Sequence, residues 1–370
     1  MTSALLWELP LAIRRSVATG SPGRREEPTV PPRVSAYPEL RYMGSKKRLL
    51  PWIHEVLSRY DFDSVYDPFT GTGCVAYLFK SLGRRVIASD FLNFASLIAQ
   101  ATIENNTHRI EGKILRALCS PPKSARTFIQ DTYAGIFYSR EDLEFLDRVS
   151  DVLQSIYHPH QRALGYAALF RACLKKQPRG VFTVSGDLVH YDDGRRDLKL
   201  PIREHFIEQI EVFNKVVFNN QRRNKALCGD VFELAAPRVD LVYLDPPYVP
   251  RSDDNCYIKR YHFLEGLSTY WEGMPIDKST KVRKIAKRYT PFSYRRDALD
   301  AFDRLFSRFS RSKIALSYSS NGYPDLDQLI ALLSRYKRSI EVFEKPHRYH
   351  FGTHRAVERA RTVEYLIVGQ

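Results

Sequence analysis

The stretch Ser64–Asp90, SVYDPFTGTGCVAYLFKSLGRRVIASD, determines the fold expected for this chain of 370 residues. Its apolar beginning, Ser64–Asp67, predicts a strand, and a glycine-rich turn and a helix over Val75–Leu82 follow. A glycine ends that helix, and Arg85–Ser89 predicts a second strand that leads into the last aspartate of the stretch. A strand, a helix and a strand at this spacing form a βαβ unit, which implies a parallel sheet with a right-handed crossover.

The turn of this unit has the features of a nucleoside-binding loop. Gly71 and Gly73 allow positive φ angles and close approach of the backbone, and N–H groups at a helix N-terminus suit a polar or anionic ligand. Asp90 follows about 20 residues later, where a carboxylate can accept hydrogen bonds from both ribose hydroxyls. The turn lacks the Gly-Lys-Ser/Thr of a P-loop and the third glycine of a dinucleotide fingerprint. The pattern therefore favours an adenosine without a pyrophosphate, although a purely structural turn is the usual explanation of Gly-x-Gly alone.

A second segment, Asp245-Pro246-Pro247-Tyr248, follows the apolar run Val239–Leu244, which predicts a buried strand. The exocyclic nitrogen of adenine or cytosine is a poor nucleophile, because its lone pair is delocalised into the ring. The Asp245 side chain and the Pro246 carbonyl can accept hydrogen bonds from both N–H groups, since proline restricts the backbone here. Tyr248 offers a flat face for stacking, worth roughly 1–3 kcal/mol per base. A base inside a duplex cannot reach such a pocket, so base flipping is implied. A proline-rich turn with a capping aspartate is the alternative.

Composition and periodicity divide the chain into three parts. Residues 1–35 are rich in Pro, Arg, Ser and Gly and predict a mobile tail, with a short helix near Leu5–Ile13. Residues 36–105 and 225–370 carry the α/β pattern, and residues 106–224 predict an inserted, mainly helical domain. Helices are expected at Leu49–Leu57, Glu141–Tyr157, Gln161–Lys175 and Ile202–Phe218, and further strands at Ala226–Cys228, Lys313–Tyr318 and Val363–Val368.

Bulk properties narrow the class of protein. The formal net charge of +15 and the pI near 9.5 favour a polyanionic partner, with a generally soluble basic protein as the alternative. The five cysteines are scattered, and no CxxC or Cys/His cluster occurs in the sequence, so neither a metal site nor a disulfide framework is expected. No apolar stretch of about 18 residues is present, so no membrane span is expected. A cytoplasmic location fits best.

Basic residues also cluster near the C-terminal third, in Lys278–Arg288. Lys281, Lys284 and Lys287 can follow phosphates beside the second segment, which would make affinity fall steeply with salt. A solvated helix face is an equally common explanation of such a cluster.

Taken together, these segments resemble the Dam-type, D12-class family of DNA adenine-N6 methyltransferases, which use S-adenosylmethionine on a Rossmann-like fold. Arg41–Lys46 is similar to the N-terminal cofactor motif of that family, and Asp67–Gly73 to its glycine motif. Asp90 corresponds to the ribose-binding acid and Asp245–Tyr248 to the catalytic motif. The linear order also agrees, with a target-recognition insert between the ribose acid and the catalytic motif.

The resemblance implies further cofactor-binding residues. Tyr42 and Lys46 would hold the methionine end of S-adenosylmethionine, and Asp67 and Phe69 would belong to the same pocket. Asp230 stands where the family contacts the adenine of the cofactor. Taken alone, Lys46 also fits a solvated lysine, and Asp230 a capping residue after a strand.

In the insert, Arg171 and the segment Pro178–Val184 are similar to a family segment of the type Arg…Gly-x-Phe-Asn-Val. Thr183 stands here in place of the asparagine. By this resemblance Arg171 and Arg179 would contact DNA, with an ordinary β-hairpin edge as the alternative.

The sequence thus predicts an adenine-N6 methyltransferase that acts on double-stranded DNA, with a cognate restriction enzyme as a candidate partner. Adenine is favoured because the catalytic tetrapeptide begins with Asp245, whereas family cytosine-N4 enzymes usually begin it with serine. An RNA adenine-N6 or DNA cytosine-N4 methyltransferase and a non-catalytic DNA-binding protein on the same scaffold are the alternatives. The DNA sequence recognised and the oligomeric state do not follow from the sequence.

Overall fold

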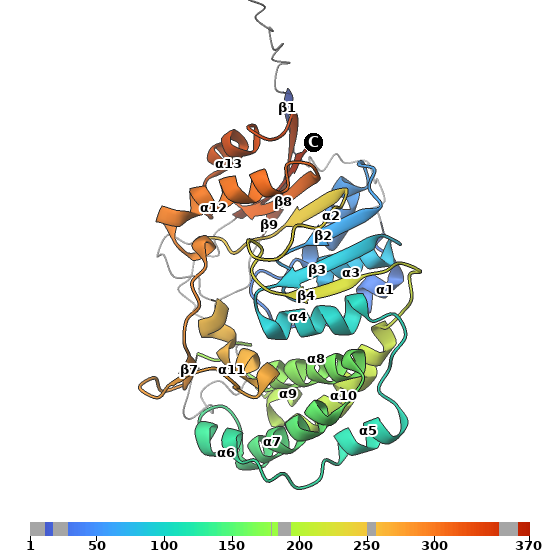
Figure 1. Ribbon diagram of the computed structural model, residues 1–370, viewed down its shortest axis with the longest axis vertical. Helices are drawn as coiled ribbons and strands as arrows, with labels where there is room; N and C mark the ends of the chain where they lie inside the picture. The colour runs from blue at the N-terminus through green and yellow to red at the C-terminus, as the bar shows by residue number, and fades with distance from the viewer. Residues whose placement is uncertain (1–11, 18–28, 179, 184–193, 250–256, 348–361) are drawn as a thin grey trace, which may run out of the picture.

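The computed structural model describes residues 12–17, 29–178, 180–183, 194–249, 257–347 and 362–370. An eight-stranded sheet crosses the molecule in the order β1-β9-β10-β8-β5-β2-β3-β4 (Figure 1). Neighbouring strands are parallel except at β10, which is antiparallel to both β8 and β9. The strands are β1 (Ala12–Val17), β2 (Ser64–Asp67), β3 (Arg85–Asp90), β4 (Lys225–Cys228), β5 (Leu241–Leu244), β8 (Lys313–Ser319), β9 (Ser339–His347) and β10 (Thr362–Gly369).

Helices cover both faces of this sheet, so successive residues of its central strands face different cores. Leu241 and Tyr243 of β5 pack with α2, α3 and α4, whereas Val242 and Leu244 pack with α12 and α13. Strands buried on both faces are continuous apolar runs, and this explains why β5 could be recognised in the sequence. The helices are α2 (Leu50–Leu57), α3 (Cys74–Ser81), α4 (Asn93–Ala99), α12 (Arg295–Arg308) and α13 (Leu326–Leu333).

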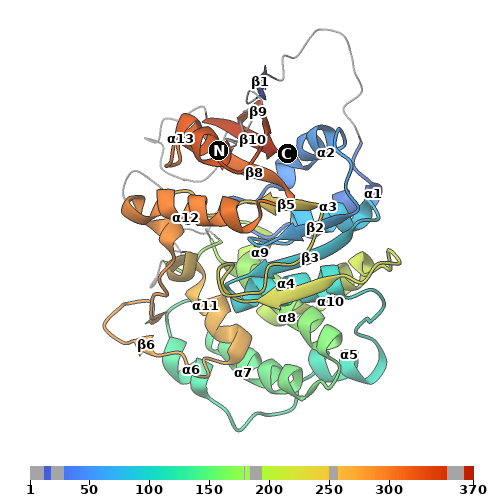
Figure 2. The same cartoon turned by 45° about the horizontal axis from the view of Figure 1, so that its top comes forward.

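A helical layer lies beyond α4, at the end of the molecule opposite α13 (Figures 1 and 2). Its helix α8 packs on α4 and on the π-helix η2 (Gln100–Glu104), so the core continues from the sheet into this layer. The layer contains α5 (Gly112–Cys119), α6 (Phe128–Tyr133), α7 (Arg140–Ser155), α8 (Pro159–Lys176), α9 (Arg196–Lys199) and α10 (Ile202–Val216).

The segment after the Asp-Pro-Pro-Tyr motif also joins the helical layer. Helix α11 (Tyr257–Thr269) leads to Trp271, whose ring centroid lies 5.5 Å from that of Phe128 and 5.2 Å from that of Tyr133. A hairpin of β6 (Ile276–Asp277) and β7 (Lys284–Ile285) follows. Residues from both sides of the Asp-Pro-Pro-Tyr motif therefore build this layer.

The predicted helices and strands of the α/β part are confirmed within a few residues, as are the long helices α7, α8 and α10. The tail prediction is wrong for residues 12–17, which form the edge strand β1, paired in parallel with β9, and for Pro32–Ser35, which form α1 with Val34 buried. Most of the helix expected near Leu5–Ile13 lies outside the described residues. Backbone pairing holds β1, and Arg15 adds an ion pair with Asp327 at 2.7 Å. The remaining short elements are α1 (Pro32–Ser35), η1 (Lys47–Leu49) and η4 (Pro291–Ser293).

Lys278–Arg288 was expected either to follow DNA phosphates or to form a solvated helix face. This segment contains the strand β7 and not a helix. Among the described helices, none combines the length and the apolar composition that a bilayer crossing requires.

Candidate active site

A cavity of about 610 Å³ opens at the carboxyl ends of β2, β3, β4 and β5. The chain runs from β2 to β3 and β4 on one side of the sheet and returns through β5 and β8 on the other. The cavity therefore lies where the strand order reverses, which is the usual ligand site of open parallel sheets. It brings together the glycine turn, the residues after β3 and β4, and the Asp-Pro-Pro-Tyr motif.

The glycine turn after β2 is shaped so that its backbone faces the cavity. Gly71 has φ +50° and Gly73 has φ +77°, in the region that favours glycine. A Cβ on Gly71 would lie 3.1 Å from the Tyr42 ring. The Gly71 N–H donates to Asp90 Oδ2 at 2.9 Å, and this bond connects the turn to the end of β3.

Asp90 lines the cavity and is oriented by backbone groups. Its Oδ1 accepts a second hydrogen bond, from the Leu92 N–H, at 2.9 Å. Burial raises the pKa of Asp90 to about 6, while the Leu92 and Gly71 N–H groups oppose that shift. The carboxylate is therefore ionised at neutral pH, and its remaining lone pairs are available to a ligand.

Asp245 lines the same cavity and is oriented by a cation. The Lys46 Nζ lies 2.9 Å from Asp245 Oδ1, and the lysine side chain is 2% exposed. Burial raises the pKa of Asp245 to about 6, and the charge of Lys46 opposes the shift. The ion pair thus keeps a buried carboxylate ionised at neutral pH.

Tyr248 completes this end of the cavity. Its hydroxyl accepts a hydrogen bond from Lys46 Nζ at 2.7 Å and lies 3.4 Å from Asp245 Oδ1. Its ring packs edge-on against Tyr318, with the centroids 4.8 Å apart. Pro246 and Pro247 line the cavity beside it.

The loop that carries Tyr42 and Lys46 is held by helix α11. The Tyr261 hydroxyl accepts a hydrogen bond from the Met43 N–H at 2.8 Å. The Tyr42 and Tyr261 rings stack with centroids 4.7 Å apart and planes at 19°. Helix α11 follows the Asp-Pro-Pro-Tyr motif in sequence, so it connects the two motifs that supply Lys46 and Asp245.

Of the other predicted cofactor residues, Asp67, Phe69 and Asp230 also line the cavity, whereas Gly73 does not. Asp67 is 2% exposed, and burial, followed by the nearby Asp245, raises its pKa well above the usual range. The Phe69 ring packs edge-on against Phe292, with centroids 5.4 Å apart. Asp230 Oδ1 accepts the N–H of the residue two positions later, at 2.8 Å.

The predicted DNA-contacting residues lie in two regions. Arg171, on α8, is partly buried and donates to the Glu39 carbonyl at 3.1 Å and to Gln209 Oε1; burial lowers its pKa. These contacts join α8 to α10 and to the segment before α2, so they favour a bracing role for Arg171. Arg179 lies outside the described residues.

Lys281 and Lys287 are exposed, and Lys284 is partly buried on β7. In Figure 1 the β7 hairpin projects from the side of the molecule, beside α11.

Two carboxylates that sequence reasoning missed contact the site. Glu364, on β10, is fully buried, with Oε2 4.0 Å from Lys46 Nζ and 3.4 Å from the Tyr248 hydroxyl. Glu265, on α11, pairs with Arg288, a cavity-lining residue, and accepts N–H groups from the first turn of α4. The available signal for Glu364 was a charged residue inside an otherwise apolar strand, which requires a buried partner.

Comparisons with known proteins agree with this geometry. Residues 42–319 match the model of the D12 class of N6 adenine-specific DNA methyltransferases. The chain is 30% identical over 327 residues to the type II methyltransferase M2.HphI of Haemophilus parahaemolyticus, covering 85% of this chain and 92% of that protein. It is 26% identical to the modification methylase StsI of Streptococcus sanguinis, over 80% of this chain and 46% of that protein. It is 23% identical to the type II methyltransferase M.FokI of Planomicrobium okeanokoites, over 88% of this chain and 52% of that protein. The chain thus spans about half the length of these last two relatives.

Proposed function

Because the chain belongs to the D12 class of N6 adenine-specific DNA methyltransferases, which use S-adenosylmethionine, we propose that the cavity at the strand ends is its active site. The Asp245 end of the cavity is defined here by Asp245, Lys46 and Tyr248, and the Asp90 end by Asp90 and Gly71. In this proposal the Asp245 end receives the adenine of the DNA, and the Asp90 end receives the nucleoside part of the cofactor.

The Asp90 end has the shape and chemistry that S-adenosylmethionine requires. The cavity of about 610 Å³ falls in the range of roughly 300–1,000 Å³ that is common for small-molecule sites. Gly71 leaves room for close approach, and the free lone pairs of Asp90 suit ribose hydroxyls. Asp230, Tyr42 and the other cavity residues would enclose the adenine and methionine parts. S-adenosylmethionine supplies a methyl group on a positively charged sulfur.

The Asp245 end would activate the adenine. An ionised Asp245 accepts one hydrogen bond from the N6 amino group, and the Pro246 carbonyl accepts the other. Both bonds would draw the nitrogen towards a tetrahedral geometry, which would free its lone pair to take the methyl group as the carbon–sulfur bond breaks. The surplus N6 proton would then be lost to Asp245 or to water. Tyr248 stacks on the flipped base, and Lys46 keeps Asp245 ionised. Positioning and polarisation of the amino group then supply the rate enhancement.

One observation carries this assignment: Asp245, the residue suited to polarise an amino group, lies in the same cavity as Asp90, the residue suited to hold ribose. A structural capping aspartate would have no reason to share a cavity with a nucleoside-binding turn. The parallel sheet around this cavity is therefore interpreted as a Rossmann-like methyltransferase fold, and the helical layer as its target-recognition part.

The direct test is transfer of labelled methyl groups from S-adenosylmethionine to unmethylated genomic DNA, with RNA in parallel. The products are digested to nucleosides and identified by mass. We expect N6-methyladenine from double-stranded DNA. Label found only in RNA, or only as N4-methylcytosine, would overturn the assignment of substrate at this site.

We further propose that the β6–β7 hairpin contacts DNA phosphates through Lys281, Lys284 and Lys287. We also propose that a cognate restriction enzyme accompanies this protein and that the protein is cytoplasmic. Sequencing of methylated positions in the host genome, followed by a digestion assay with host extract on methylated and unmethylated DNA, would test for such a partner. Cleavage of both DNAs alike, or of neither, would contradict it.

A further inference from the structure

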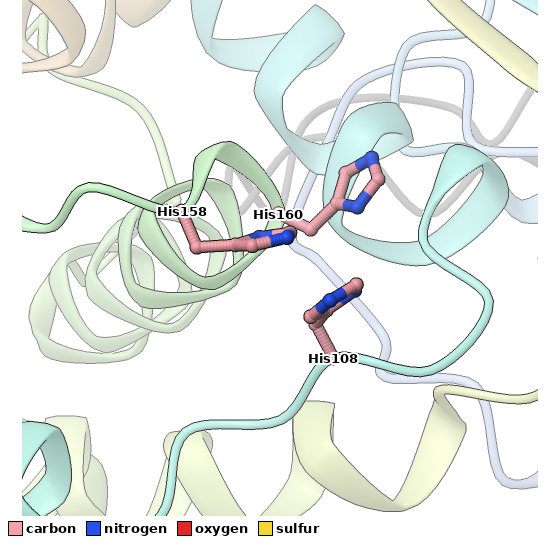
Figure 3. Close-up of side chains that lie close together, drawn as sticks. All are labelled: His108, His158 and His160. Atoms are coloured by element: carbon pink, nitrogen blue, oxygen red, sulfur yellow. The ribbon is translucent and has the colours of Figure 1, made fainter.

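Three histidines converge outside the cavity, where the helical layer meets the sheet. His108 follows the π-helix η2, and His158 and His160 lie at the start of α8 (Figure 3). Each is partly buried, and one ring nitrogen from each lies within 4.8 Å of those of the other two. The His108 and His158 rings stack with their centroids 3.6 Å apart. None of the three lines the cavity.

The ring nitrogens in this group have lone pairs to offer. The Nδ1 atoms of His158 and His160 are buried and have no hydrogen-bond partner among the described residues. Buried polar atoms without partners are rare, because each forfeits its hydration. His108 Nδ1 lies 3.2 Å from the Thr107 hydroxyl, and when it donates its proton there, its other nitrogen carries the lone pair.

A carboxylate stands beside the histidines. Glu104 is the last residue of η2, and its Oε1 lies 3.8 Å from His160 Nε2. Its Oε2 accepts the N–H of Ala226, on β4, at 3.3 Å, so one oxygen is positioned by the sheet and the other lies near His160. π-helical turns are uncommon and often occur at functional sites.

We propose that His108, His158 and His160 bind a divalent transition-metal ion of the zinc class, and that Glu104, beside His160 Nε2, orients the His160 ring. Three imidazoles are a ligand set suited to zinc, nickel or cobalt, and without thiolates they disfavour copper(I) and iron–sulfur clusters. With zinc–nitrogen bonds of about 2.0–2.1 Å, the nitrogens of a tetrahedral site stand roughly 3.4 Å apart. The nitrogens lie within 4.8 Å of one another, so the three rings would move closer together when the ion binds. The scattered sequence positions explain why no such site was expected from the sequence.

The position indicates a structural ion. Helix α8 packs on both η2 and α4, and a metal at this point would fasten its first turn to η2 and, through Glu104, to β4. The proposal is independent of the methyl-transfer assignment, because its test measures metal binding.

The experiment uses the full chain, purified without a histidine tag and stripped with a chelator. Calorimetric titration with zinc should show one equivalent bound, and Tm should rise with the logarithm of free zinc. Cobalt(II) should give the visible absorption of a tetrahedral site. His108→Gln and His160→Gln should weaken zinc binding by about 100-fold or more, since even outer-shell changes cost 10–100-fold.

His54→Gln is the matched control, because His54 lies on α2 and outside this group, and it should bind zinc as the unaltered chain does. Glu104→Gln removes the carboxylate but keeps a polar side chain, so it provides a second test if a histidine variant fails to fold, as judged by circular dichroism. The proposal is overturned if the unaltered chain binds no stoichiometric zinc, or if the His108, His160 and Glu104 variants bind it with unchanged affinity.

Discussion

The two ends of the cavity hold carboxylates with similar pKa values by different means. Asp90 and Asp245 both titrate near 6, because burial raises both pKa values. Asp90 is held by two backbone N–H groups, whereas Asp245 is held by the charge of Lys46. Backbone donors are fixed by the fold and survive substitution of side chains. A charge pair can be lost by one substitution, so the Asp245 end should be the more sensitive of the two.

Asp245→Ala should have the largest effect on methyl transfer and should show whether the two ends of the cavity have separate functions. Removing a preorganised group that acts on the transition state costs about 10²–10³-fold in turnover, and we expect at least this loss of methyl transfer. The affinity for S-adenosylmethionine, measured by calorimetry, should change little, because the cofactor is assigned to the other end. Asp300→Ala, at an exposed position of α12, is the control. Loss of both transfer and cofactor binding would contradict two separate ends.

Lys46→Met should have the next largest effect, through the ionisation of Asp245. Breaking one partner of a buried ion pair costs about 3–5 kcal/mol, so Tm should fall clearly. Without the lysine charge, the pKa of Asp245 should rise above about 6, which leaves more of it protonated at pH 7. Transfer should therefore drop at pH 7 and recover partly at higher pH. Lys225→Met, on the exposed side of β4, should show neither change; an unshifted pH profile in Lys46→Met would refute the role of the pair.

Asp90→Asn should chiefly weaken cofactor binding. The amide cannot accept hydrogen bonds from both Gly71 and Leu92, and a loss of about 1–3 kcal/mol corresponds to roughly 5–150-fold in the Kd for S-adenosylmethionine. In the unaltered enzyme this Kd should also rise as the pH falls through about 6, because protonation removes an acceptor. The Asn variant should lose that pH dependence. If Asp245→Asn loses it instead, the two ends are assigned in the wrong order.

Lys281→Ala, outside both ends, should have the smallest effect and supplies a baseline. Loss of one phosphate contact should weaken DNA binding equally for all sequences and reduce the salt slope by about 0.9. Cofactor affinity should stay the same. Fluorescence anisotropy at several salt concentrations measures this, with Lys113→Ala on α5 as the control. A sequence-dependent loss would indicate base contact instead.

The central fold could be predicted because its signals are local. The strands β2, β3, β5 and β8 are short apolar runs, since helices cover both faces of the sheet. Helices α7, α8 and α10 have regular apolar spacing. The edge strand β1 and the hairpin of β6 and β7 gave no such signal. Their pairing is between backbones, and β1 pairs with a strand far along the chain.

In the candidate site, too, some features have a local sequence signal and others depend on long-range contacts. Gly71, Asp90 and Asp245 could be identified from residue type and from position at the ends of predicted strands. Their contacts could not be predicted, because Lys46 and Tyr248, for example, are separated by 202 positions and meet only when the sheet is assembled. The same holds for Glu364 beneath Lys46, and for His108, which reaches His158 and His160 only when α8 packs on η2. Local sequence specifies which groups are present and on which element, whereas strand order and helix packing decide which charges and lone pairs come within bonding distance.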